Sequence, residues 1–325
     1  MKRKNVVTNM KKLNNPFVVY GYKGAEYFCD RVSETEKIVK GLSNERNITL
    51  IAPRRIGKTG LIHHVFANMR ETQPDVCCIY FDSLSTKTLE QFVQLMARSV
   101  LGRLDTPTQV ALHKVQDFFS AFRPTMTFDA TSGMPTFSLD IVKNQEEQSD
   151  MFLSPERPLY QGAQIVNITE INERVYYNFA NDRFMERGQQ LPESVFHYIY
   201  KKIDGQTWYV QAILNRIYSN QPELITDIDV DMAIQELIDE QEVAFENYYQ
   251  SLTTNQAALL LAIAKEGNVK SPMAQAFISR YRLPALSSIK SALESLLDNQ
   301  FIYQYNGGYI VYDRFFGMWL RERIE

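Results

Sequence analysis

Apolar residues in the first hundred positions form two short runs, separated by segments with helical spacing. Asn47–Ala52 and Val76–Phe81 are apolar over successive residues and bounded by polar ones, which is typical of buried parallel strands. Lys58–Met69 carries apolar residues at helical spacing, and a second helix is predicted over about Thr86–Leu104. The order strand, helix, strand, helix predicts a parallel sheet flanked by helices.

Three shorter segments extend this α/β region. Ser33–Leu42 predicts a short helix with Ser33 as its N-cap, because a glutamate follows three residues later, as in a capping box. Apolar and polar residues alternate over Thr125–Asp129 and Thr136–Ile141, on either side of a Thr-Ser-Gly turn, which predicts a β-hairpin. Gln164–Ile168 is a candidate for one more strand.

After residue 150 the pattern becomes helical. Helices are predicted over 170–187, 192–203, 206–219 and 229–249. Pro192 at a helix start and Gly205 after a helix end occupy the usual positions of these residue types.

The last 75 or so residues follow another pattern. Helices are predicted over 255–265, 271–280 and 287–299. Asn306-Gly307-Gly308 then joins two short apolar segments, 301–304 and 309–312, which is a strong hairpin signal. Three helices followed by a hairpin predict a winged helix. We therefore expect a basic N-terminal arm (1–14), an α/β core (15–169), a helical lid (170–250) and a winged-helix domain (251–325).

Composition narrows the class of protein. The 325 residues are 45% apolar and 22% charged, which excludes a disordered or coiled-coil chain. A net charge of −3 argues against a protein built mainly to hold nucleic acid. No apolar stretch reaches membrane-spanning length and no secretory signal pattern is present, so no membrane partner is expected. The three cysteines, Cys29, Cys77 and Cys78, make a poor disulfide framework, so we expect a reducing, cytoplasmic compartment.

One motif carries recognisable chemistry. Residues 52–59, Ala-Pro-Arg-Arg-Ile-Gly-Lys-Thr, lie between the first predicted strand and its helix and match the phosphate-binding loop G-x-x-x-x-G-K-[ST], with Ala52 in place of the first glycine. Backbone N–H groups of such a loop, together with the helix N-terminus, surround phosphates with positive potential. The predicted nucleotide contacts in this loop are Pro53, Arg54, Arg55, Ile56, Gly57, Lys58, Thr59 and Gly60.

The side chains of this loop have distinct expected roles. Gly57 lets the backbone approach the phosphates, Lys58 adds a positive charge, and the Thr59 hydroxyl is a hard oxygen ligand for Mg²⁺. Arg54 and Arg55 either contact the γ-phosphate or pair with carboxylates on a neighbouring loop, and the sequence leaves both alternatives open. ATP and Mg²⁺ are therefore the expected cofactors.

The chain also resembles a known family. The resemblance rests on Asn15-Pro16-Phe17, on residues 27–31 (Tyr-Phe-Cys-Asp-Arg), on the phosphate-binding loop, on residues 154–160, and on residues 312–316 with Trp319-Leu320. In these segments the chain is similar to the archaeal-type AAA+ ATPases of the STAND class. The resemblance implies a P-loop core, a helical lid and a winged helix that act as an ATP-driven switch. It also implies that Phe28, Asp30 and Arg31 lie near the adenine side of the nucleotide.

The chain departs from this family at the Walker B and sensor strands. Between Ile141 and Met151 there is only a polar run, so two βα units of about 30 residues each are missing. Either an internal segment has been lost near Ser149–Asp150, which we favour, or the core is rearranged. Asp82 follows an apolar run and is a weak substitute ligand for Mg²⁺. Catalytic residues are therefore left unassigned, and ATP hydrolysis is less secure than ATP binding.

The charges of the winged helix disfavour DNA as a partner. Residues 252–325 carry eight Lys or Arg against six acidic residues, and the predicted recognition helix sets Lys290 against Glu294 and Asp298. Phosphate neutralisation needs several basic residues on one face. We therefore expect an ATP-binding switch whose lid and winged helix dock a protein partner or a second copy of the chain. A winged-helix DNA-binding regulator and a degenerate ATPase that binds ATP without hydrolysing it are the alternatives.

Overall fold

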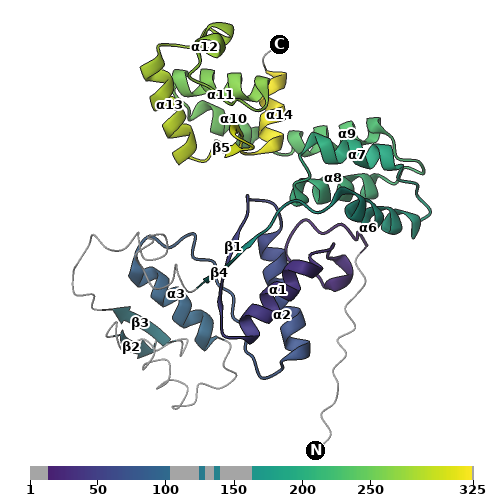
Figure 1. The fold of residues 1–325 in the computed structure, drawn as a ribbon, viewed down its shortest axis with the longest axis vertical. Helices are drawn as coiled ribbons and strands as arrows, with labels where there is room; N and C mark the ends of the chain where they lie inside the picture. The colour runs from purple at the N-terminus through teal and green to yellow at the C-terminus, as the bar shows by residue number, and fades with distance from the viewer. Residues whose placement is uncertain (1–13, 103–123, 129–134, 140–162, 324–325) are drawn as a thin grey trace, which may run out of the picture. The chain divides into compact units, whose positions relative to one another are not determined.

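The computed structural model describes residues 14–102, 124–128, 135–139 and 163–323. The chain divides into two compact units (Figure 1). The sheet unit comprises Arg31–Pro53 and Lys58–Ile168, and the helical unit comprises Met1–Asp30, Arg54–Gly57 and Thr169–Glu325. Within the described ranges, no helix is both long and apolar enough to cross a membrane.

The sheet unit contains a small parallel sheet and a separate hairpin. Its elements are α1 (Val32–Ser43), β1 (Asn47–Ile51), α2 (Lys58–Thr72), α3 (Leu89–Leu101), β2 (Pro124–Phe128), β3 (Pro135–Leu139) and β4 (Ala163–Asn167). β1 pairs with β4 in parallel, from Asn47 opposite Ala163 to Ile51 opposite Asn167. β2 and β3 form an antiparallel hairpin. The predicted first strand, its following helix, the hairpin and the strand near 164–168 are thus confirmed.

The predicted strand Val76–Phe81 is wrong. These residues join no strand in the structure, and none of them is fully buried. Among the described strands β1 pairs only with β4, so the apolar run 76–81 adds no third strand to this sheet. The prediction that β1 is buried is also wrong. Ile51 is 51% exposed, and exposed and partly buried residues alternate along β1.

The predicted N-cap of the first helix is wrong by two residues. α1 begins at Val32, and Arg31 occupies the N-cap with a positive φ of 69° and no side-chain cap bond. Thr35 N–H donates to Arg31 O at 2.8 Å and closes the first helical turn. Ser33 therefore lies inside α1 and is not its N-cap.

The helical unit is a continuous series of helices with one hairpin. Its elements are a short 3₁₀ helix (Ala25–Tyr27), α6 (Glu173–Met185), α7 (Glu193–Lys202), α8 (Thr207–Asn220), α9 (Asp227–Asp239), α10 (Glu242–Gln250), α11 (Thr254–Glu266), α12 (Gln275–Tyr281), α13 (Leu286–Asp298), β5 (Ile302–Tyr305), β6 (Gly308–Val311) and α14 (Arg314–Glu322). The helices and the hairpin after Asn255 confirm the predicted winged-helix pattern. α14, which follows the hairpin, is a helix that the sequence pattern does not predict.

The single helix predicted over 229–249 is in fact two helices. α9 ends at Asp239, and Gln241 N–H bonds to Ile238 O in a tighter turn before α10 begins. The break redirects α10 so that Phe245 packs against two aromatic rings of α14, with ring centroids 5.3 Å from Phe316 and 6.0 Å from Trp319. Tertiary packing of this kind lies beyond the reach of a local helical pattern.

One apolar core runs through the helical unit. Tyr176, Phe196, Tyr209 and Ile213 are fully buried, and the same cluster extends to the α14 aromatics. Phe17, from the segment before the sheet unit, packs on Phe184 with ring centroids 5.0 Å apart. Each side chain of this size contributes about 1.5–3 kcal/mol when it leaves water. The helical unit is therefore a well-packed body.

Candidate functional site

The predicted phosphate-binding loop has the backbone shape that its sequence requires. It leaves β1 after Ile51 and ends where α2 begins at Lys58. Gly57 has a φ of +95°, in the region that favours glycine. A Cβ placed there would meet only ordinary contact, with Thr207 Cγ2 at 3.8 Å, so the glycine is required by the turn rather than by crowding.

Lys58 is folded back over the loop. Its Nζ donates hydrogen bonds to Ala52 O at 2.6 Å and to Pro53 O at 2.9 Å. These carbonyls hold the ammonium group at the mouth of the loop, where bound phosphate oxygens could replace them as acceptors. The first turn of α2 carries no acidic residue that would offset the positive end of its dipole.

The other loop residues predicted to contact the nucleotide differ in how far their side chains are exposed. Thr59 is exposed in the first turn of α2, so its hydroxyl is open to a metal ion, and Gly60 follows it in the same turn. Ile56 is only 1% exposed, so its side chain anchors the loop and only its backbone can face a phosphate. The donor set of loop amides, an ammonium and a hydroxyl suits a nucleotide phosphate with Mg²⁺.

Arg55 is held by the lid and the winged helix. Its Nη2 lies 2.7 Å from Asp313 Oδ2, and its Nη1 donates to the Tyr209 hydroxyl. The guanidinium lies 4.4 Å from the ring centroid of Trp208, whose backbone N–H donates to Arg55 O at 2.9 Å. We call Arg55, Trp208, Tyr209 and Asp313 the arginine clamp. Of the two alternatives for Arg55, the structure therefore shows pairing with a carboxylate.

The clamp keeps a non-glycine residue in an unfavourable conformation. Arg55 has a φ of +64°, and a left-handed residue other than glycine costs about 1–3 kcal/mol. A charge-assisted hydrogen bond contributes about 1.5–3 kcal/mol, which is enough to offset that strain. The clamp thus fixes the backbone of the loop two residues before Gly57.

Tyr209 is the buried centre of the clamp. Its hydroxyl accepts from Arg55 and also from Arg314 N–H at 2.9 Å, and its ring packs edge-on against Phe315 at 4.8 Å. Burial raises the pKa of this phenol, and the Asp313 carboxylate raises that pKa further. The Tyr209 hydroxyl therefore stays neutral and acts as a fixed acceptor at the junction of loop, lid and winged helix.

The other residues predicted to contact the nucleotide make contacts with protein side chains in the structure. Arg54 is exposed, and its guanidinium lies 5.5 Å from the ring centroid of Tyr312. Phe28 packs edge-on against Tyr22 at 5.8 Å. Arg31 is buried and pairs with Glu34 at 2.9 Å. The adenine-side roles of Phe28 and Arg31 stay a prediction from the resemblance.

The described residues supply no Walker B acid. Asp82 is exposed, and its Oδ1 accepts from Leu84 N–H at 2.9 Å, so it closes a local turn. No group of three or more His, Cys, Asp or Glu residues that could hold a metal occurs in the described part of the chain. The polar run 142–150, Arg157 and the proposed join at Ser149–Asp150 lie outside the described residues.

The sequence did not single out Trp208, Tyr209 and Asp313 as site residues. Asp313 caps α14, accepting from Phe315 N–H at 3.0 Å and Phe316 N–H at 3.2 Å, and an Asp before an aromatic helix start is a recognisable signal for such a cap. Its second role, the ion pair with Arg55, has no local signal because the two residues are far apart in the sequence.

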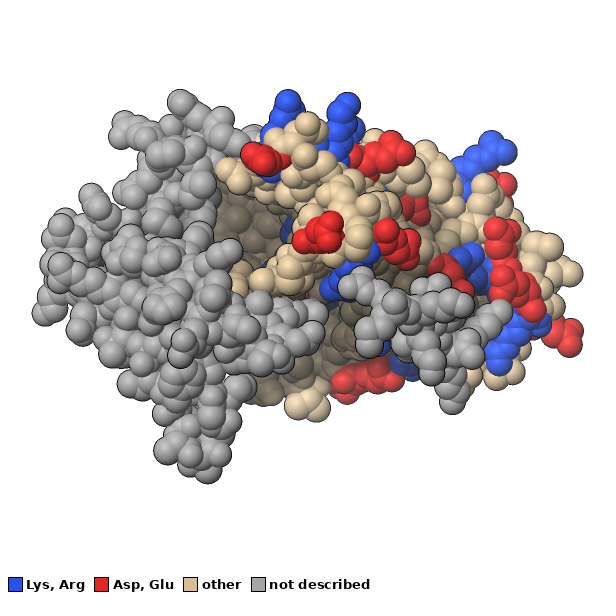
Figure 2. All heavy atoms as spheres, turned by 90° about the horizontal axis from the view of Figure 1, so that it is seen from below, with Lys and Arg blue, Asp and Glu red and all other residues tan. Residues whose placement is uncertain are grey.

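The described residues form no broad basic area on one face of the molecule (Figure 2). On the face shown in Figure 2, basic and acidic side chains of the described residues alternate without a broad basic area. In α13, which would be the recognition helix, Lys290 lies among Glu294 and Asp298. This distribution is a poor match for a phosphate backbone.

Comparisons with known proteins agree with this architecture. Residues 243–322 match a family model described as a probable winged helix domain. The whole chain is similar to the Walker-type ATPase PABY2304 of Pyrococcus abyssi, with a TM-score of 0.57 and 14% identity over 94% of this chain and 99% of that one. A chain of the Drosophila ORC bound to DNA aligns over 91% of this chain and 87% of its own at 12% identity, but its TM-score of 0.41 is too low to carry an argument. No curated protein matches the sequence significantly.

These likenesses establish the fold. The chain has the fold of a Walker-type ATPase with a C-terminal winged helix, and the parallel sheet among the described residues has two strands. At 14% identity the likeness does not extend to chemistry, which rests on the residues of the loop and the clamp.

Proposed function

We propose that this protein is an ATP-binding switch of the STAND type. The observation that carries the proposal is the position of Lys58, whose ammonium lies over the carbonyls of a strand–loop–helix turn at 2.6 and 2.9 Å. In this proposal Lys58 contacts the nucleotide phosphates, and the loop amides around Gly57 donate to them. Thr59 supplies a hydroxyl ligand to Mg²⁺, which neutralises phosphate charge when bound.

The switch acts through the arginine clamp. Arg55 belongs to the phosphate-binding loop, and its guanidinium bonds to Tyr209 of the lid and Asp313 of the winged helix. Phosphates in the loop would compete with Asp313 for the charge of Arg55, because guanidinium binds phosphate and carboxylate with the same fork geometry. Nucleotide binding would then weaken the clamp and loosen the contact between the loop, α8 and the start of α14.

Binding and turnover are separate parts of the proposal. Hydrolysis needs an acid that positions the attacking water, and Asp82 is committed to a local turn. We therefore propose ATP binding as the primary activity and a low rate of hydrolysis, with ATP serving mainly as the ligand that sets the switch.

Calorimetric titration of Mg-ATP into the full chain tests this proposal. Lys58→Ala should weaken binding at least about 100-fold, or about 2.7 kcal/mol, because it removes the ammonium group proposed to contact the phosphates directly. Lys37→Ala, at an exposed position on α1 of the same unit, is the matched control and should bind like the parent. Equal affinity of the Lys58→Ala variant and the parent would contradict the proposal.

A further inference from the structure

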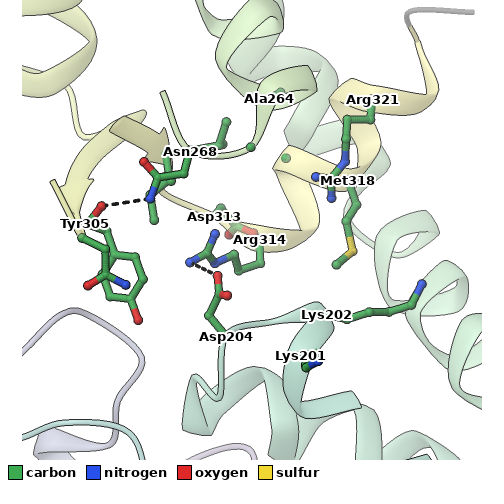
Figure 3. A pocket seen from close by; sticks show the side chains of 15 residues that line it. Lys201, Lys202, Asp204, Ala264, Asn268, Tyr305, Asp313, Arg314, Met318 and Arg321 are labelled. Carbon is green, nitrogen blue, oxygen red and sulfur yellow. Dashed lines mark hydrogen bonds and ion pairs between the residues drawn. The ribbon is translucent and has the colours of Figure 1, made fainter. Parts of the chain in front are cut away.

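A polar pocket of about 310 Å³ lies between the lid and the winged helix, apart from the phosphate-binding loop (Figure 3). It is lined by the end of α7, the end of α11, the β5–β6 hairpin and one face of α14. This volume is at the lower end of the range found for small-molecule sites, about 300–1,000 Å³. The size therefore suits a small, compact ligand.

Basic side chains outnumber acidic ones in the lining, four to two. Lys201, Lys202, Arg314 and Arg321 face two acids, Asp204 and Asp313. Both acids are already engaged, since Asp204 Oδ2 lies 2.6 Å from Arg314 Nη2 and Asp313 Oδ2 lies 2.7 Å from Arg55 Nη2. The pocket thus carries an excess of positive charge.

The basic side chains differ in whether they already have a partner within the protein. Lys202 already forms an ion pair, because its Nζ lies 2.9 Å from Asp231 Oδ1. Lys201 and Arg321 have no ion pair among the described residues. Arg314 Nε is buried and has no hydrogen-bond partner in the described part of the chain. Lys201 and Arg321 are therefore available to a ligand, and Arg314 Nε is an unsatisfied buried donor on the same helix as Arg321.

Helix geometry brings two of these groups together. Arg314 and Arg321 are seven residues apart on α14, so they lie two turns apart on one face, with Met318 between them. Figure 3 shows both side chains on the pocket side of this helix. Partial burial lowers the pKa of Arg321, and the charge of Arg314 lowers it further. A bound anion would offset the charge of Arg321, which has no ion pair among the described residues.

We infer that this pocket is a second anion site, which binds a small molecule through its phosphate groups. Arg321 of α14 and Lys201 of α7 supply the charge, and Arg314, whose buried Nε has no hydrogen-bond partner among the described residues, lines the same pocket. Guanidinium groups fit phosphate oxygens with paired hydrogen bonds, which distinguishes this ligand class from a simple halide. None of the lining residues belongs to the phosphate-binding loop, so this site and the proposed ATP site are tested with different variants.

The test uses inorganic pyrophosphate as the probe and the full chain carrying Lys58→Ala, so that the loop does not contribute. Calorimetric titration at low salt should still show binding at one site. Adding Arg321→Gln should weaken it at least about tenfold, and Lys201→Gln should weaken it by a smaller factor. Lys270→Gln, an exposed lysine of the winged-helix domain outside the pocket, is the matched control and should change nothing.

Two outcomes would overturn the inference. One is that the Lys58→Ala protein binds no pyrophosphate. The other is that binding persists but neither Arg321→Gln nor Lys201→Gln weakens it. Lys201 is exposed on α7, so its variant leaves α14 unaltered and keeps the test valid if Arg321→Gln disturbs the helix. Thermal unfolding of each variant checks that the fold is retained.

Discussion

The two units bury their apolar residues to very different degrees. In the helical unit, Ile213 and Phe196 are fully buried within one continuous core. In the sheet unit, Ile51 of β1 and Ile165 of β4 are 51% and 54% exposed, although they belong to the parallel sheet that should form the centre of a Walker-type ATPase fold. Among the described residues, the large continuous core therefore lies in the lid and the winged helix. It also agrees with the two-stranded form of the parallel sheet among the described residues.

The largest expected effect compares the same substitution in the two units. Ile213→Ala removes a fully buried side chain and should lower the free energy of unfolding by about 2–5 kcal/mol, because it leaves a cavity. Ile165→Ala should cost about 1 kcal/mol or less, because this side chain is already half in water. Urea unfolding followed by circular dichroism measures both values. Similar losses of unfolding free energy for the two variants would show that the two units do not differ in the burial of these side chains.

A smaller effect tests whether the arginine clamp ties Arg55 to the winged helix. Asp313→Asn keeps a good N-cap for α14 but removes the charge that pairs with Arg55. A double-mutant cycle of Asp313→Asn with Arg55→Gln should give a coupling energy of about 1–2 kcal/mol, because both side chains are partly exposed. Urea unfolding of the four proteins measures it, and additive losses would mean that the pair contributes no stability.

The features that the sequence predicted correctly are those with local causes. The turn between β1 and α2, the helix after it and the Asn306-Gly307-Gly308 hairpin all follow from neighbouring residues, and the structure contains them, whereas phosphate binding by the turn stays a prediction. The turn at Gly57 is likewise set by backbone conformation rather than by distant contacts.

The features that the sequence missed have distant causes. Val76–Phe81 is apolar enough for a strand, but a strand also needs a partner edge, which a local pattern does not reveal. The clamp joins Arg55 to Tyr209 and Asp313, which only the folded chain brings together. The break between α9 and α10 likewise follows from the packing of Phe245 on α14. Folding therefore added the link between the loop and the lid, which is the feature on which the proposed switch depends.

Tryptophan fluorescence during Mg-ATP titration tests the central claim most directly. The chain has two tryptophans, and the ring of Trp208 lies 4.4 Å from the guanidinium of Arg55, so subtracting a Trp208→Phe titration isolates its signal. If phosphates draw Arg55 out of the clamp, the emission of Trp208 should change in a saturable way in the parent protein and stay constant in Lys58→Ala. Saturable binding of ATP by calorimetry with no change in Trp208 emission would contradict the claim that the loop signals to the lid through Arg55.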